Sequence, residues 1–173
     1  MPVTVAIIGA GPLGRSLAMR AARAGFRVFL EDVMPSNLHH AQEFIRTELN
    51  AAALTSVTFV LTVEDAVREA DLIIDCVPDE LESKLEILWL LDRMAPPHAV
   101  IATPTTTQSI ADLASCTYRP DKCIAIAAEP AELAKAEGPT IQRRTAPGTA
   151  KETIALVENF WRALGLTPEF EVA

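Results

Sequence analysis

The sequence predicts an α/β fold in which helices cover both faces of one parallel sheet. Short apolar runs rich in Val, Ile and Ala alternate with amphipathic segments along the chain, and this alternation is typical of a doubly wound sheet. The runs are almost continuously apolar, as expected of strands buried on both faces. The chain has 173 residues, half of them apolar, which is about the usual size of one domain. We therefore expect a single domain over residues 1–173.

Six apolar runs predict about six parallel strands. In chain order they are residues 3–9, 26–32, 56–61, 71–77, 98–103 and 122–128. The final stretch, residues 168–173, predicts a possible extra edge strand. Between residues 129 and 149 the apolar residues follow neither the spacing of a helix nor that of a strand. This segment is therefore interpreted either as a short helix with a loop or as a mobile flap.

The first helices have recognisable ends. Leu13–Ala24 is expected to be helical and to stop at Gly25, because glycine readily adopts the left-handed conformation that closes a helix. Pro35 is expected in the first turn of a helix that runs to about Leu49, because proline needs no hydrogen-bond partner there. Thr62 is a suitable cap for a short third helix.

The later helices are predicted by apolar stripes and caps. In residues 79–95 the stripe is formed by Leu81, Leu85, Leu88 and either Leu91 or Asp92, and Asp79 with Glu82 has the spacing of a capping box. The next two helices are expected to begin at Ser109-x-x-Asp112 and Thr149-x-x-Glu152. The last helix has an apolar face of Ile154, Val157, Phe160, Trp161 and Leu164 and ends at Gly165.

The composition disfavours several functions. The formal net charge is −8 without a basic run, so nucleic acid and anionic membranes are poor candidates as partners. No basic segment precedes the first apolar run and no run reaches membrane-spanning length, so we expect a soluble, cytoplasmic protein. Cys76, Cys116 and Cys123 lack metal-type spacing, so we expect no metal site and interpret them as small buried residues in a reducing compartment.

A glycine-rich loop follows the first predicted strand. Gly9, Gly11 and Gly14 have the G-x-G-x-x-G spacing, and they lie between a strand and a helix. The first glycine permits the turn, the second admits a pyrophosphate, and the third lets the helix pack closely on the strand. Backbone N–H groups and the helix dipole then favour the phosphate charge. The pattern therefore predicts a dinucleotide site, although glycines serving packing alone stay possible.

Asp32 ends the second predicted strand, 23 residues after Gly9. A carboxylate there accepts hydrogen bonds from ribose hydroxyls and repels a 2′-phosphate. The next residues are Val33, Met34 and Pro35, with no arginine, so the sequence favours NAD over NADP. The other interpretation of Asp32 is a solvated strand end.

Four stretches together resemble the NAD-binding domain of 3-hydroxyacyl-CoA dehydrogenases, a Rossmann-type fold. They are VAIIGAGPLGRSLA with GFRVFLEDV, EADLIIDCVPDELESK, MAPPHAVIATPTTTQSIADLA, and FWRALGLTP. The resemblance implies a set of cofactor-binding residues: Gly9, Gly11, Pro12, Leu13, Gly14, Asp32, Val77, Asp79, Lys84 and Thr105. It also implies that Thr106 stands where the family has a serine that contacts the substrate oxygen. The other interpretations are a helix N-cap for Asp79, a solvated lysine for Lys84 and a loop hydroxyl for Thr106.

The resemblance fails where proton transfer is expected. The family uses a His after the sixth strand as base, oriented by a Glu about a dozen residues later. Here Ala127 and Gln142 occupy these positions. His39, His40 and His98 are expected on the surface, away from the site. Glu129 and Glu132 follow the sixth strand, and solvated loop carboxylates are the preferred interpretation of both.

Three hypotheses follow. The first is an NAD-binding module without the parental activity, and the second is an NAD-dependent oxidoreductase with altered catalytic residues. The third is a structural scaffold with a vestigial site. The helical C-terminal domain of the family is not expected in this chain, so a homodimer or another protein partner is expected on the face that this domain would cover. Phe160, Trp161 and residues 146–149 are the candidates for that face.

Overall fold

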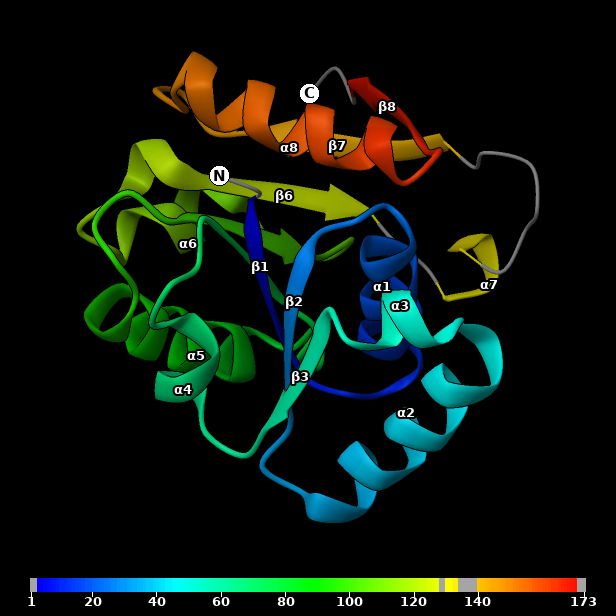
Figure 1. Ribbon diagram of the computed structural model, residues 1–173. Coiled ribbons are helices and arrows are strands. Elements are labelled where there is room, and N and C mark those ends of the chain that lie inside the picture. The colour runs from blue at the N-terminus through cyan, green and yellow to red at the C-terminus, as the bar shows by residue number, and fades with distance from the viewer. Residues whose placement is uncertain (1–2, 128–129, 134–139, 171–173) are drawn as a thin grey trace.

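The computed structural model describes residues 3–127, 130–133 and 140–170, and these form one sheet with helices on both faces (Figure 1). The strands are β1 Thr4–Ile8, β2 Arg27–Glu31, β3 Val57–Val60, β4 Leu72–Asp75, β5 Val100–Pro104, β6 Cys123–Ala127, β7 Thr140–Thr145 and β8 Thr167–Phe170. The helices are α1 Pro12–Arg23, α2 Pro35–Glu48, α3 Ala51–Leu54, α4 Val63–Val67, α5 Leu81–Met94, α6 Ile110–Ser115, the 3₁₀ helix η1 Pro120–Lys122, α7 Pro130–Leu133 and α8 Lys151–Ala163.

The sheet confirms the predicted Rossmann-type topology. Its order is β3-β2-β1-β4-β5-β6-β7-β8, and the first six strands in this order are parallel. The chain moves outward from β1 to β3 and then returns to place β4 on the other side of β1. The strand order therefore reverses between β1 and β4, and in such sheets ligands bind beyond the carboxyl ends of the strands at this point. The expected edge strand is β8.

Strand β7 corrects the interpretation of residues 129–149. The structure confirms a short helix, α7, but residues 140–145 form a strand antiparallel to β6. This strand buries Ile141 and Arg143 at alternate positions. The Arg143 guanidinium forms an ion pair with the Glu158 carboxylate of α8, which compensates for burying its charge. A charged residue at an inward position hides the period-2 pattern, which is why the sequence did not indicate a strand.

Two apolar layers hold the helices on the sheet. One layer joins β-strand residues to α1, α2 and α8, and the other joins them to α4, α5 and α6. Figure 1 shows α4, α5 and α6 together on one side of the strands and α1 and α2 on the other. Within the described residues, no helix combines the length and apolar character that a membrane crossing requires.

Several predicted helix ends are confirmed and others are shifted. Gly25 has φ +87° just after α1, and Thr62 and Ser109 accept hydrogen bonds from backbone N–H groups in α4 and α6. The capping box at Asp79 is wrong, because α5 begins after Glu80 and the Asp79 carboxylate binds another loop. Thr149 does not cap α8, because its hydroxyl bonds to Ala146 instead.

The exposed apolar residues differ from those expected. Phe160 and Trp161 are 2% and 0% exposed, so they are not candidates for a protein interface; Phe160 packs against Phe26. The α5 stripe is also shifted: Lys84, Ile87, Leu88 and Leu91 are buried, whereas Leu81 and Trp89 are exposed. Cys116 is exposed rather than buried. A homodimer or other partner stays a prediction, as does a cytoplasmic location.

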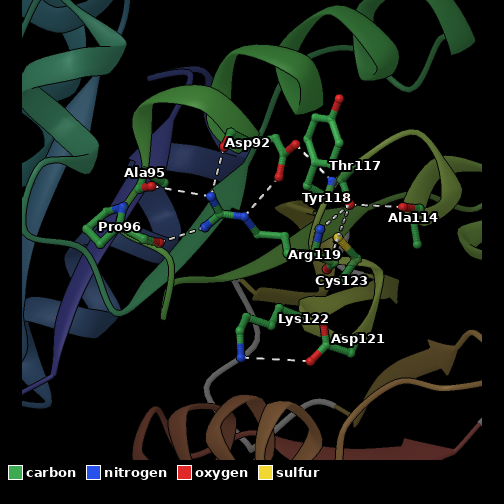
Figure 2. A network of polar contacts seen from close by, with 10 residues as sticks. All are labelled: Asp92, Ala95, Pro96, Ala114, Thr117, Tyr118, Arg119, Asp121, Lys122 and Cys123. Carbon is green, nitrogen blue, oxygen red and sulfur yellow. Dashed lines mark hydrogen bonds and ion pairs between the residues drawn. The ribbon is translucent and has the colours of Figure 1, made fainter.

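Arg119 connects the carboxyl end of α5 to the segment before β6 (Figure 2). Its guanidinium donates to the Asp92 carboxylate at 3.0 Å and to the backbone oxygens of Asp92, Ala95 and Pro96. These carbonyls lie at or just past the helix end, where no helical N–H is available to them. The Arg119 and Asp92 side chains are 10% and 5% exposed, so the ion pair is largely desolvated.

We expect Arg119→Met to lower the free energy of unfolding by about 3 kcal/mol, because it leaves the Asp92 charge buried and several carbonyls unpaired. Thermal and urea unfolding measure the change. The control is Arg68→Met, which removes an exposed ion pair with Asp65 and should cost less than about 1 kcal/mol. Equal losses in the two variants would contradict a special role for Arg119.

Candidate functional site

A cavity of about 410 Å³ opens at the carboxyl ends of β1, β2 and β4, where the strand order reverses. Gly9, Gly11, Asp32 and Asn37 form part of its wall. The remaining lining residues are Ile8, Glu31, Val33, Val63, Cys76, Val77, Pro78 and Ile87. Gly9, Gly11 and Asp32, which the sequence predicts to form a dinucleotide site, therefore lie in one crevice.

The three glycines have different steric surroundings. Gly9 has φ +99°, a conformation that L side chains rarely adopt. A Cβ on Gly14 would lie 1.8 Å from the Gly9 carbonyl oxygen, so α1 could not approach β1 as closely with any other residue. A Cβ on Gly11 would meet no atom within 4 Å. Gly11 is therefore not required for packing, and its missing side chain leaves the cavity open at the start of α1.

The Asp32 carboxylate is fixed in the cavity wall. It accepts hydrogen bonds from the backbone N–H groups of Ala10 at 2.9 Å and Met34 at 2.8 Å, and from the Asn37 side chain at 3.1 Å. Asp32 is 8% exposed, which excludes the solvated strand end. A carboxylate has about four acceptor positions, so one is left for a ligand.

A second, smaller cavity of about 170 Å³ lies next to the first. Its lining residues are Leu13, Val77, Asp79, Pro104, Thr105, Thr106 and Pro130. The Asp79 carboxylate accepts hydrogen bonds from the Thr105 hydroxyl and, at 2.9 Å, from the Thr106 N–H. Partial burial opposes ionisation of Asp79, but these hydrogen bonds outweigh it and lower the pKa of the carboxyl group. Asp79 is therefore an ionised acceptor that holds the loop after β5.

Arg144 also binds the loop after β5, and the sequence analysis did not single it out. Its guanidinium donates to the backbone oxygens of Thr105 and, at 3.4 Å, Gln108. Because Arg144 lies two residues after Gln142 in β7, both side chains project from the same face of the strand. This spacing was visible in the sequence, but it had no meaning before β7 was recognised as a strand.

Lys84 is buried beneath the site. Its ammonium lies 2.6 Å from an Asp75 carboxylate oxygen, and both side chains are 0% exposed. The interpretation of Lys84 as a solvated helix lysine is therefore wrong. Burial raises the pKa of Asp75 to about 6, although the charge of Lys84 and its hydrogen bond oppose this shift. The pair joins the end of β4 to the first turns of α5.

The two positions at which the family has its proton-transfer residues are directly paired on the neighbouring strands β6 and β7. Ala127 is the Cα partner of Gln142 in the antiparallel pairing of β6 with β7. The three histidines lie elsewhere: His39 and His40 are exposed on α2, and His98 contacts Asp71 at 3.2 Å before β5, at the opposite end of the sheet. Glu129 and the Glu132 side chain lie outside the described residues. Among the described residues no cluster of His, Cys, Asp or Glu could hold a metal ion.

The chain matches the family model "3-hydroxyacyl-CoA dehydrogenase, NAD binding domain" over residues 4–168. It is 30% identical over 133 residues to a probable 3-hydroxybutyryl-CoA dehydrogenase of Bacillus subtilis, covering 69% of this chain and 46% of that protein. It is 28% identical to 5-formyl-3-hydroxy-2-methylpyridine 4-carboxylate 5-dehydrogenase of Mesorhizobium japonicum, covering 95% and 55%. The chain thus spans about half the length of these relatives.

Two solved structures have a similar fold. The crystal structure of an enzyme described as the same pyridine-carboxylate 5-dehydrogenase, an NAD⁺-dependent dismutase, superposes with a TM-score of 0.84 at 26% identity, covering 98% of this chain and 57% of that one. The (S)-3-hydroxybutyryl-CoA dehydrogenase of Ralstonia eutropha superposes with a TM-score of 0.88 at 23% identity, covering 98% and 63%. At 23% identity the likeness concerns the fold alone.

The surroundings of the glycines lead to a contrast between two variants. We expect Gly14→Ala to cost about 3 kcal/mol of folding stability, because the new Cβ would collide with backbone at Gly9. Gly11→Ala should change stability by less than about 0.5 kcal/mol. Urea unfolding of both proteins checks this, and a similar loss in both would show that Gly11 is a packing residue.

Lys84→Met should lower the free energy of unfolding at pH 8 by about 3–5 kcal/mol, because it leaves the ionised Asp75 without a partner. A buried acid with a raised pKa destabilises the fold more as pH rises and the group ionises. The deficit relative to the wild type should therefore be smaller at pH 5 than at pH 8. The double variant Asp75→Asn, Lys84→Met is the control and should recover most of the loss. A deficit independent of pH would contradict the role of Asp75.

Proposed function

Because the chain belongs to the family of NAD-binding domains of 3-hydroxyacyl-CoA dehydrogenases, we propose that it holds NAD without the family's proton-transfer pair. On this proposal the domain is a cofactor-binding module that lacks the parental activity. The observation that carries it is the direct pairing of Ala127 with Gln142. The chain spans about half the length of its relatives. The statement that it lacks the activity of the whole enzymes is therefore also part of the proposal.

The pairing matters because directly opposed residues of an antiparallel pair have Cβ atoms about 4.5–5.5 Å apart. A His and a Glu at these two positions would be close enough for the carboxylate to orient the imidazole. An Ala has no group that can accept a proton, and a Gln carries no charge to stabilise an imidazolium. General acid–base assistance contributes roughly 10²–10⁴-fold to rate, so its loss would largely remove the reaction.

The residues of the crevice fit NAD. The open space at Gly11 and the N–H groups at the start of α1 suit a pyrophosphate. Asp32 has an acceptor position for a ribose hydroxyl, whereas a 2′-phosphate would bring negative charge against it. The smaller cavity is lined in part by Leu13, Val77, Asp79 and Thr105. The second ribose and the nicotinamide would lie there. When bound, NAD supplies a hydride acceptor.

Lys84 contributes indirectly on this proposal. Its side chain is fully buried against Asp75. In the sequence Asp75 is followed by Cys76 and Val77, which line the cavity. We assign it the task of holding the end of β4 in place for the cofactor rather than contacting the cofactor itself.

The alternative of an active oxidoreductase uses different groups. Thr106 would contact the substrate oxygen, and Asp79 is the carboxylate beside it in the smaller cavity. The lowered pKa of Asp79 makes it a weak proton acceptor, which supports the binding module over this alternative. A scaffold that binds no cofactor is the third alternative, and the binding measurement below decides it.

NAD and NADH should each raise the melting temperature of the protein in a concentration-dependent manner, because a ligand that binds only the folded state stabilises it by mass action. NADP should give a smaller shift. Gly11→Ala and Asp32→Ala should each reduce the NAD shift. Glu43→Gln, on the exposed face of α2, is the matched control. The absence of any shift at millimolar NAD would leave only the scaffold alternative.

The wild type should form no NADH from 3-hydroxybutyryl-CoA and NAD at ordinary enzyme rates. The double variant Ala127→His, Gln142→Glu restores both members of the pair and should raise the rate above that of either single variant, provided that NAD still binds. Absorbance at 340 nm follows the reaction. Rapid turnover by the wild type would overturn the proposal and favour the active oxidoreductase.

A further inference from the structure

A second acid, Glu31, lines the larger cavity beside Asp32 and was not singled out in the sequence. It is the last residue of β2 and is only 5% exposed. Among the described residues, no side chain forms a hydrogen bond or ion pair with its carboxyl group. Because Glu31 lines the cavity and no described side chain binds its carboxyl group, that group is available to a ligand.

Glu31 and Asp32 serve different sides of the cavity. Side chains alternate along a strand, so Glu31 lies on the same face of the sheet as Phe29, which packs with the layer of α4 and α5. Asp32 binds Ala10 and Asn37, on the side of α1 and α2. On this face the cavity is lined by Val63 of α4 and Ile87 of α5, which pack in the same apolar layer as Phe29. A flat apolar ring with a polar edge suits such a space.

We propose that Glu31 recognises the adenine ring of NAD by pairing its carboxyl group with the amino edge of the base. This inference rests on the proposed function, since it takes the pyrophosphate at Gly11 and the ribose at Asp32 as given. The base must then extend past Asp32. Asn37, bonded to Asp32, lines the cavity on the α2 side, so we place the base on the other side, beside Glu31, Val63 and Ile87.

The chemistry of the acid fits this task when it is protonated. Burial and the adjacent Asp32 charge raise the pKa of Glu31 to about 7, while the Gly9 N–H opposes the shift. A neutral carboxyl group has one donor and one acceptor, the same combination with which Asn or Gln pairs with adenine. The other groups around it do not compete: burial raises the pKa of the Cys76 thiol, which therefore stays neutral, and Lys84 is paired with Asp75.

The test compares NAD with 1,N6-ethenoadenine dinucleotide, in which the amino N–H groups and N1 are blocked. Dissociation constants are measured by calorimetry or fluorescence at pH 6 for the wild type, Glu31→Gln and Glu31→Leu. The wild type and Glu31→Gln should prefer NAD about tenfold more strongly than Glu31→Leu does, because a bidentate pair with a base is lost in the leucine variant. Glu43→Gln is the control and should behave as the wild type.

The pH dependence provides an independent readout. Since the protonated acid binds the base, NAD affinity of the wild type should fall about tenfold between pH 6 and pH 8, with proton uptake on binding. Glu31→Gln should remove this dependence, whereas a His39→Gln, His40→Gln variant should keep it. The affinity for nicotinamide mononucleotide, which lacks adenine, should be the same in the wild type and in both Glu31 variants.

The outcomes separate the two proposals. If NAD binds none of these proteins, the proposed function fails. If NAD binds and the leucine variant keeps the full preference for NAD over the etheno analogue, adenine recognition by Glu31 is overturned while NAD binding stands.

Discussion

The site depends on the contact between Gly14 of α1 and the carbonyl oxygen of Gly9. With a side chain at residue 14 the helix would be pushed away from β1, since a Cβ would lie 1.8 Å from that oxygen. The close approach brings the start of α1 over the point where the strand order reverses. The two cavities, Asp32 and the Asp79–Thr105 contact are all arranged around that point.

The fold could be predicted as far as hydrophobic periodicity extends. Six parallel strands and the glycine loop followed from apolar runs and turn residues. Strand β7 did not, because Arg143 occupies an inward position and is neutralised by Glu158, far along the chain. Phe160 and Trp161 were misjudged for a related reason: β7 and β8 extend the sheet, and α8 covers this extension rather than presenting its aromatic face to solvent.

The candidate site was predictable where a residue acts through its position in a motif. Gly9, Gly11, Gly14 and Asp32 were predicted in this way, and three of them, Gly9, Gly11 and Asp32, line one cavity. Glu31, Arg144 and Asp75 could not, because their roles depend on which groups the fold brings near them. Lys84 was named by the family resemblance, but its pairing with Asp75 was not predicted. Lys84 shows the difference well: in the sequence it is a lysine on an amphipathic helix, and only packing shows that it is paired and fully buried.

The outer strand β8 has a consequence for the behaviour of the protein at high concentration. Exposed strand edges invite pairing with other chains, which leads to aggregation. In β8, Pro168 has no N–H to offer, and the neighbouring Glu169 is charged and exposed. The strand is also only four residues long. These features make β8 a poor template for further strands, so the sheet is protected from edge-to-edge growth on this side.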